Sequence, residues 1–440
     1  MNRWLLVIGA MLSLAVTGCA SLGVTEAPHP PAIDTAAAPA LPADRQLLVM
    51  LAEQFVPHYR PDAGGGGSYG AAASGQQART ARALAKAYGF TVLADWPMPA
   101  LGVRCFVAEV TAGRTPADVI ERLSADPRVE SAQALQSFRV LGRDTSDITV
   151  ARRLEDPAIP GLSEQYHSAT GKGVVVAQID TGVDVRHPAL RGQIAETRNF
   201  VDGTPFGAEF HGTAVAGVIV AKPHSDIGGI APGASLISLR ACWPDPRVVG
   251  AAVCDTFTLA KALQYALTRN VRVINLSLGG PRDRLLERLL DKALERGITI
   301  LGAVDPGATG ETFPAHHPGV VAVATEWSPR VPAGTVFVPG TDVLTTIPNG
   351  RWGLVSGTSF ATAHVTGVTA LLLECSPRLE PNQVAILLRS SLQQPSPTKT
   401  AGAVPDLCAA LDRVAARASC ACCCAKANPV GGSTSARHAS

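Results

Sequence analysis

The chain has 440 residues, of which 46% are hydrophobic and 17% charged, and its formal net charge at pH 7 is +2. This length and apolar content suit two or three folded domains and exclude a chain that is disordered over most of its length. The small net charge gives no electrostatic reason to expect nucleic acid as a partner.

The first 18 residues have the pattern of an export signal, with Arg3 before a short apolar stretch that ends in small residues. That stretch is too short to span a bilayer comfortably. Residues 16–19, Val-Thr-Gly-Cys, resemble a bacterial lipobox, which is cleaved before a cysteine that carries the lipid. We therefore expect residues 1–18 to be removed and Cys19 to anchor the exported protein to a membrane, with Ala20 favouring the outer membrane. The alternative is an ordinary signal peptide and a periplasmic or extracellular protein.

A small domain is expected at residues 45–141, after a Pro/Ala-rich tether at residues 19–44. Its apolar patterns and turn residues predict a βαββαβ order, which is the ferredoxin-like α+β plait, a fold that implies no function by itself. The expected strands are 47–51, 90–95, 103–110 and 129–135, and the expected helices are 76–88 and 115–124.

A larger α/β domain is expected at residues 155–415, where strand and helix patterns alternate as in a doubly wound parallel sheet. The expected strands are 174–179, 271–278, 298–304 and 320–325, with helices at 258–269 and 284–296. Residues 142–154 form a linker that we expect to hold a processing site. Residues 416–440 are a Cys-rich tail, which we expect to be disordered.

Three short segments hold the residue types that acyl transfer by a serine requires. Asp180 follows an apolar strand, at the sheet edge where ligands gather in α/β proteins. His211 begins a run of small residues that permits close helix packing, and Ser359 precedes an apolar helix whose N-terminus favours developing negative charge. Each residue alone is weak evidence, because Gly-Thr-Ser before a helix is usually only a cap. The order Asp, His, Ser along the chain is more specific.

In these segments the sequence resembles the subtilisin-like serine proteases, or subtilases, over about residues 155–415. The motifs at 229–234 and 274–280 support the resemblance. It implies a serine endopeptidase that acts through an acyl-enzyme, with Asp180 supporting the general base His211 and Ser359 as the nucleophile. It also implies a substrate groove edge that pairs with an extended peptide, formed by Ser277, Leu278 and Gly279.

The resemblance further implies that residues 45–141 are a propeptide, which inhibits the enzyme, assists its folding and is removed by self-cleavage before about Arg153. The expected partners are therefore a polypeptide substrate and the chain's own propeptide, and we expect a monomer. No metal site and no cofactor are expected. Calcium stabilises many subtilases, but no dense Asp/Asn loop commits this chain to a calcium site.

One departure from the subtilase pattern bears on activity. Asp305 stands where subtilases place an Asn whose amide donates a hydrogen bond to the oxyanion of the tetrahedral intermediate. An ionised Asp cannot donate, and the loss of one such donor lowers turnover by about 10²–10³-fold. A protonated Asp could donate if the site raised its pKa. We therefore expect reduced or substrate-restricted activity, with a catalytically weak peptide-binding module as the alternative. Ala363 replaces a usual Pro and carries little weight.

The ten cysteines fall into groups. Cys242 and Cys254 flank a Pro-containing loop, so in an exported protein we expect a disulfide there. Cys375 and Cys408 are a second candidate pair, and Cys105 is expected to pack in the small domain. Four cysteines in the tail lack a nearby histidine and give only weak support for metal or redox function: Cys420, Cys422, Cys423 and Cys424.

Overall fold

The computed structural model describes residues 45–52, 69–144, 169–223, 228–248, 250–326, 328 and 330–391. The expected signal peptide with Cys19, the tether, most of the linker, Cys408 and the Cys-rich tail lie outside these ranges. Within them, no helix has both the length and the apolar character that crossing a membrane requires.

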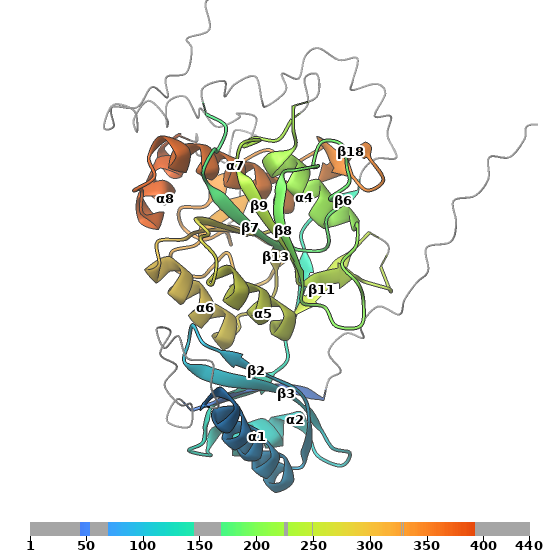
Figure 1. Cartoon of the computed structure of the whole chain (residues 1–440), viewed down its shortest axis with the longest axis vertical. Coiled ribbons are helices and arrows are strands. Elements are labelled where there is room, and N and C mark those ends of the chain that lie inside the picture. Colours follow the sequence, from blue (N-terminus) through green and yellow to red (C-terminus); the bar gives the residue numbers. More distant parts are fainter. Residues whose placement is uncertain are drawn as a thin grey trace, which may run out of the picture. The chain divides into compact units, whose positions relative to one another are not determined.

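Residues 45–52 and 69–134 form a βαββαβ unit, which we call the N-terminal plait (Figure 1). Its antiparallel sheet has the strand order β2-β3-β1-β4. The helices pack on the sheet face that presents alternate residues of β1, including Leu47 and Val49. The predicted order of elements is confirmed, with β1 at Gln46–Leu51, α1 at Tyr69–Tyr88, β2 at Phe90–Met98, β3 at Val103–Val110, α2 at Pro116–Ser124 and β4 at Val129–Ala134.

The larger part of the molecule is built on a seven-stranded, entirely parallel sheet with the order β16-β15-β14-β12-β7-β9-β8. The predicted α/β class is confirmed. The inner strands are almost entirely buried and mostly apolar, as expected for strands covered on both faces, although they also contain buried polar residues such as Gln178 and Asn275. The strands are β7 at Val175–Asp180, β8 at Ile194–Asn199, β9 at Ser235–Arg240, β12 at Val273–Leu276, β14 at Thr299–Ala303, β15 at Val321–Ala324 and β16 at Val336–Phe337.

Helices cover both faces of this sheet (Figure 1). On one face lie α4 at Phe210–Val220, α7 at Thr358–Cys375 and α8 at Pro381–Ser391, and on the other lie α5 at Thr256–Ala266 and α6 at Arg284–Glu295. The side chains of α4 and α7 are buried almost all round, because these helices pass through the centre of the domain. Both therefore hold the residues at their N-termini in fixed positions.

Two small sheets join distant parts of the chain. One has the order β10-β11-β5-β13, with β10 at Cys242–Pro244, β11 at Ala252–Asp255, β5 at Ser137–Val140 and β13 at Leu278–Gly279. The other has the order β17-β18-β6, with β17 at Val343–Ile347, β18 at Arg351–Ser356 and β6 at Arg143–Asp144. The strand predicted at 271–278 therefore divides at Ser277, because β12 pairs within the parallel sheet whereas β13 pairs with β5.

The disulfide predicted between Cys242 and Cys254 is present and joins the paired strands β10 and β11. Cys105 is buried in the plait, as predicted, and burial raises the pKa of its thiol. Cys375 is buried in α7.

The N-terminal plait contacts α5 and the start of α6. The ring of Trp96 meets Phe257 edge to face at 4.4 Å between centroids. Gln133 Nε2 donates to Asp283 Oδ2 at 2.6 Å, and Asp283 is also the N-cap of α6. The remaining free face of the plait sheet thus packs against these two helices.

Candidate active site

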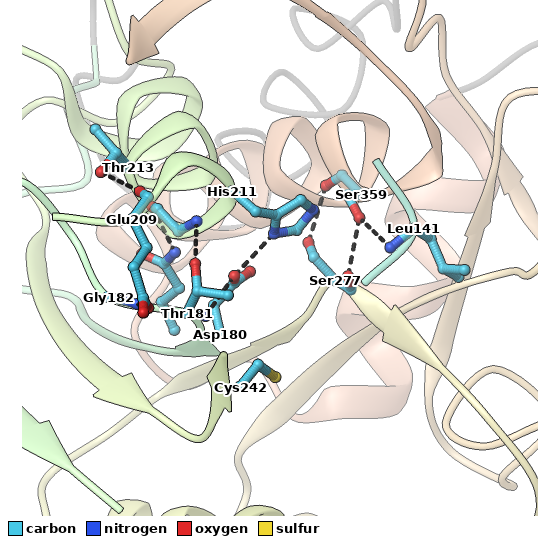
Figure 2. Close-up of polar contacts among 12 residues, drawn as sticks. Leu141, Asp180, Thr181, Gly182, Glu209, His211, Thr213, Cys242, Ser277 and Ser359 are labelled. Atoms are coloured by element: carbon cyan, nitrogen blue, oxygen red, sulfur yellow. Dashed lines mark hydrogen bonds and ion pairs between the residues drawn. The ribbon is translucent and has the colours of Figure 1, made fainter. Parts of the chain in front are cut away.

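An aspartate and a histidine form a buried pair at the carboxyl end of the parallel sheet. Asp180 is the last residue of β7, and His211 is the second residue of α4. His211 Nδ1 and Asp180 Oδ1 are 2.8 Å apart, and both side chains are almost completely buried (Figure 2). The carboxylate therefore fixes the orientation of the imidazole and favours a proton on Nδ1. The second ring nitrogen, Nε2, is buried and has no hydrogen-bond partner among the described residues.

Three contacts tie β7 and the loop after it to the start of α4. Thr181 Oγ1 accepts the N–H of Gly212 at 2.8 Å, and Gln178 Nε2 donates to the Gly212 carbonyl at 2.8 Å. Glu209 accepts the N–H of Gly182 at 2.5 Å, and its carboxylate also pairs with the buried Arg240 at 2.6 Å. These bonds hold the two catalytic candidates at a fixed separation.

Ser359 is held at the N-terminus of α7, close to His211 (Figure 2). Its hydroxyl donates to the carbonyl of Ser277 at 2.8 Å, and Ser277 Oγ donates to the Ser359 carbonyl at 2.9 Å (Figure 2). Asn275 Nδ2 in turn donates to Ser277 Oγ at 3.0 Å, and Thr366 of α7 donates to Asn275 at 2.8 Å. The strand end at Ser277 and helix α7 are thereby fixed to each other.

Residues 137–144 of the chain cross this site in an extended conformation. β5 lies between β11 and β13, with Arg139 opposite both Val253 and Gly279. β6 then pairs with β18 on the other side of the site. Between the two strands, the N–H of Leu141 is 3.3 Å from the carbonyl oxygen of Ser277 and 3.0 Å from Ser359 Oγ. The backbone of this segment is bound much as an added strand would be.

The carbonyl oxygen of Leu141 accepts the backbone N–H of Ser359 at 3.1 Å. It therefore faces the positive end of α7, where negative charge on an oxygen is stabilised. Gly357, the N-cap of α7, has φ of +143°, and a Cβ added there would lie 2.3 Å from this carbonyl oxygen. Glycine is thus required both by the backbone conformation and by the close approach of Leu141.

Gly142 is equally restricted. A Cβ on this residue would lie 2.6 Å from the ring of Phe360 and 3.0 Å from His211 Nε2. The peptide bond between Leu141 and Gly142 is therefore placed between the serine, the unpartnered imidazole nitrogen and the N-terminus of α7. This is the arrangement that serine-dependent acyl transfer needs.

Side chains of the crossing segment alternate between burial and exposure, as a strand requires. Phe138 is buried against Phe313, with ring centroids 5.5 Å apart, and rests on the backbone of Gly280. Arg139 points the other way. Its guanidinium forms an ion pair with Asp305 at 2.6 Å.

Asp305 therefore binds a neighbouring side chain. Its Oδ2 accepts from Arg139, and its Oδ1 accepts the N–H of Gly307 at 2.9 Å. No hydrogen bond between this carboxylate and the Leu141 carbonyl occurs within the described part of the chain. The donor that faces the Leu141 oxygen is the backbone N–H of Ser359.

A second histidine lies close by in sequence but has a different environment. His364 is completely buried in α7, five residues after Ser359, and burial lowers its pKa to about 4. It is therefore neutral at pH 7. Over the residues that the structure describes, no group of three His, Cys, Asp or Glu side chains could hold a metal ion.

The structure thus brings together residues that the sequence analysis singled out from separate motifs: Asp180, His211, Ser277, Leu278, Gly279, Asp305 and Ser359. Cys19 lies outside the described residues. Sequence reasoning missed the supporting residues Thr181, Glu209, Arg240 and Asn275. A weak signal was available for two of them, because Thr181 directly follows Asp180 and Glu209 lies two residues before His211.

The chain has known relatives in sequence and in structure. The family model Peptidase_S8, described as Subtilase family, matches residues 171–404, which is more than half of the chain. Subtilisin E of Bacillus subtilis (strain 168) is 34% identical over 254 residues, which cover 53% of this chain and 63% of that protein. Subtilisin of Bacillus pumilus is 34% identical over 254 residues, covering 53% of this chain and 87% of that protein.

Among solved structures, the chain is similar to the crystal structure of fervidolysin from Fervidobacterium pennivorans, a keratinolytic enzyme related to subtilisin. The TM-score is 0.63, and the match covers 84% of this chain and 61% of that one at 23% sequence identity. At this identity, the likeness supports the fold alone.

Proposed function

The chain belongs to the subtilase family, and we propose that it is an exported serine endopeptidase that matures by cutting its own chain between Leu141 and Gly142. The observation that carries the proposal is the position of this bond, with the Leu141 carbonyl oxygen 3.1 Å from the Ser359 N–H and the Leu141 N–H 3.0 Å from Ser359 Oγ. The segment occupies the groove as a peptide substrate would.

In this proposal Ser359 is the nucleophile, His211 the general base and Asp180 its support. The Ser359 hydroxyl turns from the Ser277 carbonyl to His211 Nε2, gives up its proton there, and its oxygen bonds to the Leu141 carbonyl carbon. The resulting oxyanion accepts the Ser359 backbone N–H. The tetrahedral intermediate then collapses to an acyl-enzyme, as the C–N bond breaks and the Gly142 amine takes the proton from His211. Water hydrolyses the acyl-enzyme by the same path in reverse.

Residues 45–141 are, in this proposal, a propeptide that inhibits the enzyme and assists its folding. Two features support this assignment. The segment joined to the plait fills the groove, pairing with β11 and β13. The plait itself packs against α5 and α6 through Trp96 and Gln133. After cleavage, these contacts would keep the plait bound until it is displaced or degraded.

Export and lipid anchoring through Cys19 remain proposals from the sequence, as do the outer-membrane location, a monomeric state and independence of cofactors. Membrane fractionation tests the anchor. Cys19→Ala should release the protein from membranes, and unchanged partition of that variant would remove the lipoprotein proposal.

Intact mass spectrometry of purified residues 20–440, with Ser359→Ala as the matched control, tests the enzymatic proposal. The wild type should lose residues 20–141 and leave Gly142 as the new N-terminus, while the variant stays whole. A wild type that remains uncut would instead support the peptide-binding module. Cutting of both proteins would refute Ser359 as the nucleophile.

A further inference from the structure

We propose that Asp305 is a specificity residue, which selects substrates with a basic side chain at the third residue before the bond that is cut. This inference rests on the proposed function, since it takes the segment that crosses the site as a guide to substrate. It concerns a preference for one substrate side chain, which the motifs around Asp180, His211 and Ser359 do not determine.

The first step is the direction of the side chains in β5. The backbone of this strand is held by pairing with β11 and β13, which any sequence except proline can form. Phe138 and Val140 point into the apolar interior, so Arg139 must point away from it. The Arg139 side chain is accordingly mostly exposed. Here the Arg139 guanidinium meets Asp305, with Nη2 and Oδ2 2.6 Å apart.

The second step is the environment of the carboxylate. With the crossing segment in place, the Asp305 side chain is only 8% exposed, whereas that of Arg139 is 60% exposed. An exposed ion pair contributes little, but a nearly buried carboxylate left without a cation is costly. Gly307 donates one N–H to Oδ1, which satisfies one oxygen and leaves the other directed at the guanidinium. A substrate that binds as this segment does would therefore have to supply the cation that pairs with Asp305.

The third step is the distance from the reacting bond. A Cβ built on Gly279 would lie 3.3 Å from Asp305 Cβ and 3.0 Å from Leu141 Cδ1, so Asp305 stands beside the residue whose carbonyl is attacked. Negative charge develops on that carbonyl oxygen during the reaction. An uncompensated Asp305 carboxylate would repel it, whereas a carboxylate paired with arginine is neutralised. The preference should therefore appear in kcat as well as in KM.

The experiment uses the self-processed protein and an internally quenched peptide of residues 136–145, Gln-Ser-Phe-Arg-Val-Leu-Gly-Arg-Asp-Thr. In the peptide, Arg139→Ala should lower kcat/KM about 10- to 100-fold, Arg139→Glu should lower it further, and Arg139→Lys should retain most of it. Arg143→Ala is the matched control, because it removes the same charge from the other side of the bond. It should change kcat/KM less than about threefold. Raising the salt concentration should reduce the preference.

Asp305→Asn in the enzyme should bring the rates for the unchanged peptide and the Arg139→Ala peptide to within about twofold of each other, whatever its effect on overall turnover. In the uncut chain, Arg139→Glu should slow self-cleavage, and adding Asp305→Lys should restore much of the rate.

Equal cleavage of the two peptides by the wild type would overturn the proposal while leaving the proposed function intact. A preference for arginine that persists in Asp305→Asn would also overturn it, because a group other than Asp305 would then recognise the positive charge of the substrate. A wild type that cuts none of the peptides would overturn the proposed function, and this inference with it.

Discussion

Among single changes in the segment that crosses the site, and apart from the residues of the reacting bond, removal of the Phe138 side chain should lower peptide hydrolysis the most. The side chain is 2% exposed, its ring meets Phe313 at 5.5 Å and 70°, and a Cβ on Gly280 would lie 2.3 Å from its Cδ1. Burial of a phenylalanine contributes about 1.5–3 kcal/mol, and an edge-to-face aromatic pair adds about 0.5–1.5 kcal/mol. A total of about 3 kcal/mol corresponds to a loss of about 100-fold in kcat/KM.

The assay is hydrolysis of the same quenched peptide by the self-processed enzyme, with Phe138→Ala in the peptide and Phe313→Ala in the enzyme. The four combinations form a double-mutant cycle, whose coupling energy should be about 0.5–1.5 kcal/mol. Ser137→Ala in the peptide is the control, because Ser137 is exposed and should change kcat/KM less than about twofold. A loss of less than about fivefold for Phe138→Ala would refute the burial argument. Zero coupling would refute the contact between the rings.

Two further predictions concern stability. Replacing both Cys242 and Cys254 by Ser should lower the free energy of unfolding by about 3 kcal/mol, because the cysteines are 12 residues apart and the bond restricts the unfolded chain. It should also raise KM, because β11 borders the groove. Urea denaturation checks the first effect, and an unchanged midpoint would contradict it. For His364, the folded pKa of about 4 lies below the ordinary 6.5, so the unfolded chain binds the proton more readily. Stability should be full above pH 6.5 and fall by on the order of 3 kcal/mol as the pH drops to 4. His364→Gln should remove that part of the pH slope, and parallel pH profiles for the two proteins would argue against it.

The strands that were predicted in the parallel sheet, β7, β12, β14 and β15, are almost entirely buried. β9 is equally buried but was not predicted, because it carries Ser238 and Arg240. The run 174–179 contains only one polar residue and predicts β7 to within one residue. β8 was not predicted, because this edge strand is exposed along most of its length and carries Glu196 and Arg198. β5 and β6 were not predicted, since the strands with which each pairs in the described part of the chain are more than 100 residues away.

The residues of the site also differ in whether the nearby sequence is enough to predict them. Asp180, His211 and Ser359 were identifiable because each sits at the end of an apolar strand or helix with a characteristic set of small neighbours. Whether they form a working triad stays a prediction. The pair of Arg139 with Asp305 was not foreseeable, since 166 residues separate them and each is unremarkable in its own segment. Sequence reasoning placed Asp305 beside the oxyanion, but which partner its carboxylate meets depends on how the chain crosses the groove.

The hydrogen bonds of Ser359 bear on what would keep the uncut chain inactive toward other substrates. Its hydroxyl donates to the Ser277 carbonyl and accepts the Leu141 N–H, and His211 Nε2 lies nearby without a partner among the described residues. To attack, the hydroxyl must exchange the Ser277 carbonyl for the imidazole nitrogen. A typical hydrogen bond contributes a net ~0.5–1.5 kcal/mol, and this exchange makes one as it breaks another. The free-energy cost of this exchange is therefore too small to keep the uncut chain inactive. Inhibition must come from occupancy instead, because Phe138, Arg139 and Leu141 fill the positions that any other peptide would need.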